Sequence, residues 1–131
     1  MPDDNRLAYA KYRLDTARVC LNSAKILLEN GDFKSAANRS YYCIFHAMRA
    51  VLAIDTFDSK KHSGIISMFR QKYIKTGIFA AEFSDVIENA FSIRNKSDYD
   101  DFFVISKEEV TQQIANARVF LEAVENYIGG L

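Results

Sequence analysis

The stretch that decides the fold is residues 33–54, FKSAANRSYYCIFHAMRAVLAI. As an α-helix, this segment would be apolar over most of its circumference, which is typical of a helix in the middle of a bundle. It keeps one polar stripe, whose members follow at spacings of four, three, four and three residues: Ser35, Arg39, Tyr42, His46 and Arg49. The stripe is either the solvated edge of a central helix or a basic wall that faces a groove.

Four further helices are predicted around this segment, because apolar positions recur at alternating spacings of three and four residues. They cover residues 7–28, 61–76, 82–97 and 106–128. Gly31 comes shortly after segment 7–28 and Gly77 directly follows segment 61–76, and both are stop signals. The connections are short, so neighbouring helices should run antiparallel. We therefore expect an all-α, up-and-down bundle of about five helices.

The boundaries of two helices have their own chemical signals. Asp32 can cap the helix that begins at residue 33. Ser106 and Glu109 match a capping box at the start of the last helix. The helical seams predict a core that contains ten residues: Leu14, Leu21, Ile44, Met48, Ile66, Phe69, Ile87, Phe91, Ile114 and Leu121.

Length and composition limit the class of protein. The chain has 131 residues, of which 49% are hydrophobic and 26% charged, and this composition excludes a disordered or fibrous chain. One proline and five glycines are too few for the many turns of an all-β fold. We expect residues 1–131 to form a single domain.

The sequence also carries expectations about location. Cys20 and Cys43 lie in apolar helical contexts without zinc-ligand spacing, as reduced core residues of a cytoplasmic protein would. The acidic, polar N-terminus predicts no signal peptide. Charged and polar side chains at Arg39, His46 and Arg49 interrupt the apolar stretch 36–54, which excludes a membrane span. No metal site, cofactor motif or glycine-rich phosphate loop is predicted.

Charge is segregated along a chain whose formal net charge is zero. Residues 33–81 carry eight basic side chains against two acidic ones, whereas residues 82–131 carry four against ten. One interpretation is that the two parts pair, within the bundle or between subunits. The other is an anion-binding face on the middle helices.

An arginine at the end of an apolar stripe is the most informative misfit. Arg94 shares a helix face with Phe83, Ile87 and Phe91, so it must snorkel outwards, pair with a carboxylate or point into a polar pocket. Asp98 lies four residues further on and can reach Arg94 if the helix continues that far. Two interpretations stay open: an Arg–Asp pair that fixes the helix end, and a site for phosphate or ribose.

The order of these elements resembles the HEPN domain family over residues 8–128. The resemblance is carried by four segments: AANRSYYCIFHA at 36–47, KHSGIISMF at 61–69, KTG at 75–77 and RNKSDYD at 94–100. It implies a five-helix bundle that often dimerises. Many family members are metal-independent endoribonucleases, and these are frequently toxins encoded beside a minimal nucleotidyltransferase antitoxin.

The family signature is an arginine, a polar residue and then a histidine. Arg94 and Asn95 match its first two positions, but Tyr99, Asp100 and Asp101 stand where the histidine should fall. Metal-free RNA cleavage needs a base, an acid and a cation for the phosphorane charge. Arg94 can supply the cation. Tyrosine, with an ordinary pKa of about 10, is a poor base at neutral pH.

Two functional hypotheses follow. The first is a nucleotide- or RNA-binding HEPN protein, the partner of a minimal nucleotidyltransferase in a toxin–antitoxin-type system, with catalysis left open. The second is an active metal-independent endoribonuclease toxin with a variant site of Arg94, Asp98 and Tyr99. The residues expected to bind RNA or a nucleotide are Arg94, Asn95, Arg39 and His62. We further expect a homodimer that is not bound to a membrane.

Overall fold

Helices account for the regular structure of the chain, as the sequence predicted. The computed structural model describes residues 3–131. Its elements are α1 (Asp4–Glu29), α2 (Phe33–Ile54), α3 (His62–Phe69), the π-helical turn η1 (Arg70–Ile74), α4 (Glu82–Tyr99) and α5 (Lys107–Gly129). No strand occurs among residues 3–131, so the all-α, up-and-down HEPN-like bundle is confirmed.

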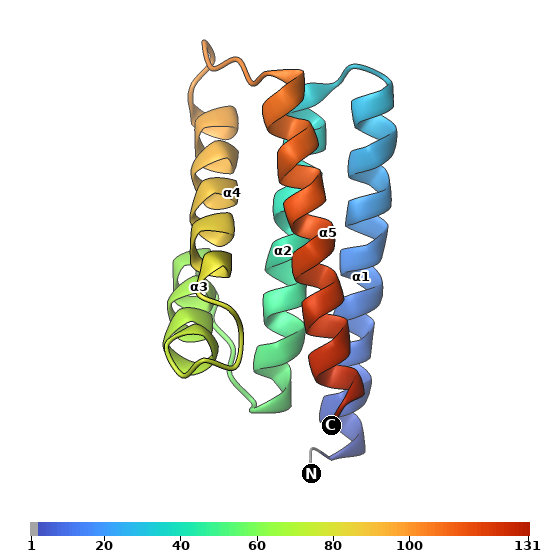
Figure 1. The fold of residues 1–131 in the computed structure, drawn as a ribbon, viewed down its shortest axis with the longest axis vertical. Helices are drawn as coiled ribbons and strands as arrows, with labels where there is room; N and C mark the ends of the chain where they lie inside the picture. The colour runs from blue at the N-terminus through green and yellow to red at the C-terminus, as the bar shows by residue number, and fades with distance from the viewer. Residues whose placement is uncertain (1–2) are drawn as a thin grey trace.

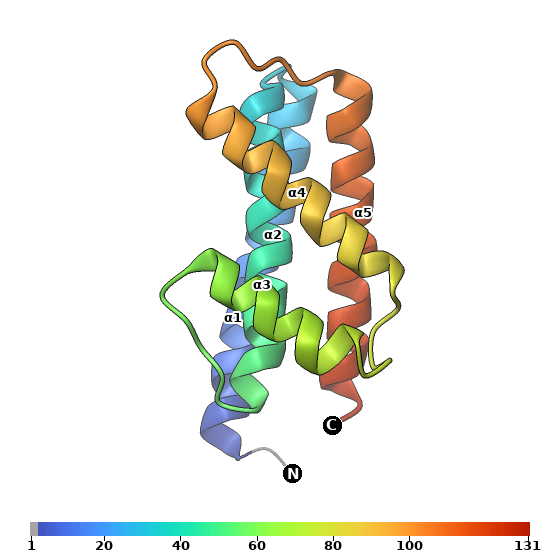
Figure 2. The ribbon, with the colours of Figure 1, turned by 90° about the vertical axis from the view of Figure 1, so that its left-hand side faces the viewer.

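The long helices α1, α2 and α5 stand side by side, and α3 and α4 lie across one flank of α2 (Figures 1 and 2). Helices α1, α4 and α5 all pack on α2, which gives it the central position that its apolar circumference predicted. The loops after α1 and α4 lie at one end of the bundle, and the start of α1 and the end of α5 lie at the other (Figure 1). The polar stripe of α2 is therefore flanked by α1 on one side and by α3 and α4 on the other.

Local signals at the helix ends act as expected. Gly31 and Gly77 have φ angles of 79° and 82°, in the left-handed region that a glycine adopts without strain. The Asp32 carboxylate accepts a hydrogen bond from the Ser35 amide at 3.2 Å. Ser106 and Glu109 form the complete capping box at the start of α5.

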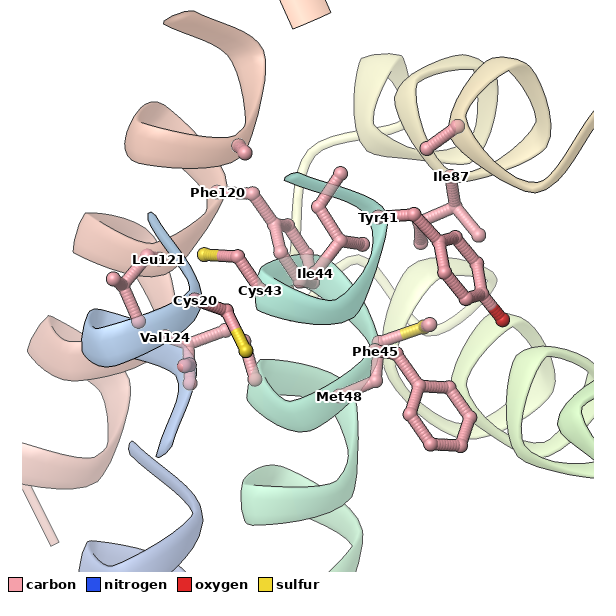
Figure 3. Packing of buried hydrophobic residues seen from close by; sticks show 14 of the residues in the cluster. Cys20, Tyr41, Cys43, Ile44, Phe45, Met48, Ile87, Phe120, Leu121 and Val124 are labelled. Atoms are coloured by element: carbon pink, nitrogen blue, oxygen red, sulfur yellow. The ribbon is translucent and has the colours of Figure 1, made fainter. Parts of the chain in front are cut away.

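The predicted core is confirmed at nine of its ten positions. The exception is Phe91, which is only half-buried because it lines a cleft between α3 and α4. Around α2, Tyr41 and Phe45 point towards α3 and α4, while Cys20 and Cys43 pack with Leu121 and Val124 on the opposite side (Figure 3). Both thiols are free and buried.

The third predicted helix is regular only over its first two turns. After Phe69 it continues as the π turn, in which the Lys75 amide donates to the Arg70 carbonyl at 2.9 Å. The turn buries Tyr73, whose hydroxyl donates to the Asp55 carboxylate just beyond α2. Among the described residues, no helix is both long and apolar enough to cross a membrane.

Candidate functional site

The polar stripe of α2 becomes part of a larger group of side chains from four helices, which we call the basic cluster. Helix α1 adds Arg13, α3 adds His62 and α4 adds Arg94 to the α2 residues. The basic cluster consists of Arg13, Arg39, Tyr42, His46, Arg49, His62 and Arg94. The fold therefore gathers three segments that are far apart in the sequence around one face of α2.

Arg94 lies partly enclosed between α4 and α2, with 19% of its side chain exposed. Its Nη2 approaches the Tyr42 hydroxyl at 3.5 Å, and its guanidinium carbon lies 5.7 Å from the centre of the Tyr41 ring. Nη1 donates to Asn95 Oδ1 at 3.3 Å. The guanidinium thus faces the aromatic wall of α2, where two tyrosines position it.

The predicted pair with Asp98 also forms, because α4 continues to Tyr99. Arg94 Nε lies 3.1 Å from Asp98 Oδ2, which is within ion-pair distance. The same Nε is buried and its N–H is not aligned for a hydrogen bond with any described residue. The pair therefore places a negative charge beside the guanidinium but leaves the Nε–H without a hydrogen bond. The predicted Arg–Asp pair is formed, and the phosphate or ribose site stays a prediction.

His62 packs against aromatic side chains of α2 that border the basic cluster. Its ring stacks on Phe45 with the two centres 4.0 Å apart, and its Nδ1 lies 2.7 Å from the Tyr41 hydroxyl. Burial lowers the pKa of His62, and the positive charges of Arg94 and Arg49 lower it further. The imidazole is therefore uncharged at neutral pH, as a general base must be.

His46 is held uncharged as well. Burial, followed by the charges of Arg13, Arg49 and Arg39, lowers its pKa to about 4. Arg13 Nη1 lies 3.2 Å from His46 Nδ1. An arginine can only donate, so Nδ1 accepts and the ring proton resides on Nε2.

Two of the four arginines in the basic cluster have carboxylate partners. Arg49 pairs with Asp58 at 3.1 Å, and Arg94 pairs with Asp98. Among residues 3–131, Arg13 and Arg39 form no ion pair. Arg39 instead lies over the Tyr42 ring at 4.9 Å. The stripe of α2 is thus a wall with uncompensated positive charge, which favours an anionic ligand.

The structure gathers most of the predicted site residues in one region around Arg94. It brings Asp98 and Asn95 to Arg94, and it places Arg39 and His62 in the same basic cluster. Tyr99 is 78% exposed at the end of α4 and contacts no aromatic ring of the basic cluster. Within the expected trio of Arg94, Asp98 and Tyr99, the contact between Arg94 and Asp98 is formed, and the catalytic role of the three residues stays a prediction.

Sequence reasoning gave Tyr41 and Arg13 no functional role. Tyr41 was visible only as one more apolar member of α2, although its hydroxyl meets His62. Arg13 reaches His46 from a helix 33 residues earlier in the chain, and no spacing rule within one helix connects the two. The stripe spacing on α2 was the signal that pointed to Tyr42 and His46.

Comparisons with known proteins agree with this architecture. The family model described as "HEPN domain" matches residues 10–127. A UPF0332 protein of Thermotoga maritima is 36% identical over 115 residues, covering 88% of this chain and 87% of its own. Two proteins of Methanocaldococcus jannaschii, named "Putative toxin MJ0142" and "Putative toxin MJ0605", are 30% and 31% identical. They cover 88% and 86% of this chain, and the matches span 78% and 83% of their own lengths.

Proposed function

The chain belongs to the HEPN domain family, and we propose that it is a toxin-like HEPN protein that binds RNA or a nucleotide through the basic cluster. The observation that carries the proposal is the incomplete pairing of Arg94 and Arg39. Arg94 is held against Tyr41 and Tyr42 with an unaligned Nε, and Arg39 beside it has no carboxylate partner. Guanidinium groups that keep a positive charge or an unsatisfied N–H are suited to phosphate oxygens, which accept charge-assisted hydrogen bonds.

The aromatic part of the basic cluster supports the same ligand class. Proteins that bind single-stranded nucleic acid combine a basic groove with aromatic rings on which bases stack. Tyr42 lies between the two arginines, with Arg39 over its ring and Arg94 at its hydroxyl. The uncharged state of His46 and His62 adds two hydrogen-bonding groups that do not repel the neighbouring arginines.

Two partners belong to the proposal. The resemblance to HEPN toxins supports a minimal nucleotidyltransferase as the antitoxin, with residues 1–131 acting as a single domain. Charge segregation supports a homodimer, because the basic middle of the chain could meet the acidic part of a second copy. Sedimentation at micromolar concentration tests the homodimer, and a species of 14.9 kDa would contradict it.

Binding is tested with a fluorescently labelled single-stranded RNA of ten nucleotides. We expect the wild type to bind it and Arg94→Ala to lose at least tenfold in affinity, while the melting temperature moves by only a few degrees. Arg18→Ala is the matched control, because Arg18 also pairs with carboxylates but lies outside the basic cluster. A wild type that binds no RNA, with an Arg94→Ala variant that simply melts earlier, would leave Arg94 as a structural residue.

A second function is favoured by His62. In a metal-independent endoribonuclease, a base takes the proton of the 2′-hydroxyl and the 2′-oxygen attacks phosphorus. The bond from phosphorus to the 5′-oxygen then breaks, and the departing oxygen takes up a proton, leaving a 2′,3′-cyclic phosphate. Arg94 would stabilise the charge on phosphorus. His62, uncharged and hydrogen-bonded to Tyr41, is better placed as the base than the exposed Tyr99.

Cleavage of a 5′-labelled RNA in the presence of a chelator tests this second function. If His62 is the base, His62→Ala loses cleavage and keeps RNA binding, while Tyr99→Phe cleaves normally. If the variant site of Arg94, Asp98 and Tyr99 is correct, the loss appears in Tyr99→Phe and Asp98→Asn instead. Absence of cleavage in the wild type would leave RNA or nucleotide binding as the function.

A further inference from the structure

A cleft of about 540 Å³ lies beside the basic cluster, between the start of α2 and the end of α4. Its polar lining includes Lys34, Asn38, Arg39, Ser97 and Asp98. Figure 1 shows why the two helix ends meet: α2 starts and α4 ends at the same end of the bundle. Asp98 connects the two sites, because it lines the cleft and also pairs with Arg94.

The lining of this cleft presents hydrogen-bond donors. Asn38 Oδ1 already accepts from Arg39 Nε and Nη2, at 3.3 and 3.0 Å, so the Asn38 amide nitrogen is left to donate. Ser97 Oγ is buried and has no hydrogen-bond partner among the described residues. Asp98, the one carboxylate of the lining, is engaged by Arg94.

Lys34 adds a positive charge that the helix itself does not need. It lies in the first turn of α2, where a cation opposes the helix dipole and so costs helix stability. Among residues 3–131 it forms no ion pair, and neither does Arg39. Two uncompensated cations, an amide donor and an unpartnered hydroxyl therefore converge on one cleft, and this combination is complementary to a phosphate group.

We propose that this cleft binds a second phosphate of the RNA strand whose neighbouring phosphate is bound at Arg94. The proposal rests on the proposed function and names its ligand as an oligonucleotide rather than a mononucleotide. The strand would follow the polar stripe of α2. Helix α2 is about 22 Å long from Lys34 to Arg49 at 1.5 Å per residue, enough for a bound segment of roughly four nucleotides or more.

The test compares a ten-nucleotide single-stranded RNA with adenosine monophosphate as ligands of the full chain. We expect Lys34→Ala to weaken RNA binding about fivefold at low salt and to weaken mononucleotide binding much less. Each lost phosphate contact should also lower the slope of log affinity against log salt by about 0.7. Lys25→Ala, which removes another exposed lysine outside the lining of this cleft, is the matched control.

Ser97→Ala separates a ligand-binding role from a structural one. If the hydroxyl is only a buried orphan, its removal leaves RNA affinity unchanged and raises stability slightly. We expect instead a two- to threefold loss of RNA affinity with an unchanged melting temperature. Equal RNA affinities and salt slopes for Lys34→Ala and Lys25→Ala, alongside a clear loss in Arg94→Ala, would overturn the second phosphate site and keep the proposed function.

A titration with inorganic phosphate covers the remaining outcome. If the wild type binds no RNA, the proposed function fails, and the oligonucleotide proposal fails with it. Phosphate-dependent NMR shifts at the Asn38 side-chain amide and the Ser97 backbone amide would then show an anion site without RNA binding. The absence of such shifts would overturn the anion site as well.

Discussion

Helix α2 carries polar groups on two of its sides. The two groups differ in charge, in burial and in how completely their members are paired. Towards α5, Gln113 donates to the Ala37 carbonyl and to Ser40 Oγ, and Ser40 in turn donates to the same carbonyl. This Gln113 network is uncharged, and Ser40 and Gln113 are 0% and 6% exposed. Towards α1, α3 and α4 lies the basic cluster, which is half-buried, cationic and only partly paired.

We interpret the Gln113 network as polar side chains that stabilise the fold, and the basic cluster as polar side chains that bind a ligand. Hydrogen bonds within a buried neutral network stabilise the fold because they offset the cost of removing polar groups from water. In the Gln113 network Nε2 and Ser40 Oγ are bonded, and only Gln113 Oε1 lacks a partner among the described residues. A ligand site has the opposite requirement: its donors must stay available at the surface. The predictions below, ordered from the largest expected effect to the smallest, test whether the two sides of α2 differ in this way.

The free energy of unfolding should fall at acid pH, because of the histidines in the basic cluster. The pKa of His46 is about 4 in the folded chain and near its usual 6.5 in the unfolded chain, so the unfolded state binds more protons between these values. Stability should be complete above pH 6.5 and decline as the pH falls towards 4. The loss should be about 2–3 kcal/mol, and the lowered pKa of His62 acts in the same direction.

Urea unfolding between pH 4 and 7 measures this decline. His46→Gln should flatten the curve, because glutamine cannot take up the proton. Gln113→Ala should shift the curve down without changing its shape. A His46→Gln curve that stays parallel to the wild type would assign the acid sensitivity to the carboxylates instead.

Removal of the network side chain should cost stability and nothing else. Gln113→Ala loses two hydrogen bonds and opens a small cavity between α2 and α5, so the free energy of unfolding should fall by about 2 kcal/mol. RNA affinity should remain that of the wild type. Gln112→Ala, at the exposed neighbouring position, controls for helix propensity. A loss of RNA affinity in Gln113→Ala would remove the distinction between the two sides.

Much of this comparison was visible in the sequence, and the missing part has a physical cause. Periodicity located the helices, the central place of α2 and the stripe of Arg39, Tyr42 and His46, because these depend on neighbours within one helix. The Arg94–Asp98 pair was predictable for the same reason. The contacts of Arg13 with His46 and of His62 with Tyr41 depend on how helices cross, which no single-helix pattern encodes.

The hydroxyl that positions Arg94 should have a small effect of its own. Tyr42→Phe keeps the ring beneath Arg39 but removes the oxygen that lies 3.5 Å from Arg94 Nη2. We expect RNA affinity to fall about threefold, or roughly 0.6 kcal/mol, with an unchanged melting temperature. Tyr127→Phe, which removes a tyrosine hydroxyl from a ring that packs on Tyr73 and Phe79 outside the basic cluster, is the matched control. Equal affinities in both variants would assign the position of Arg94 to Asp98 alone.

The smallest effect is expected at Tyr99. Its ring is 78% exposed and contacts no aromatic ring of the basic cluster, so Tyr99→Phe should change stability by less than about 0.5 kcal/mol. RNA affinity should stay within twofold of the wild type. A strong loss of affinity or cleavage would show that the end of α4 joins the site, as a second copy of the chain in a homodimer could arrange.

The two buried thiols allow the opening of the native bundle to be measured. Cys20 of α1 and Cys43 of α2 lie on the side of α2 opposite Tyr41 and Phe45 (Figure 3). Burial raises the pKa of both thiols, that of Cys43 to about 12, so in the closed bundle they are protonated and shielded from reagents. A thiol-specific dye can react only after α1 and α2 part, and its labelling rate therefore reports how often the native bundle opens.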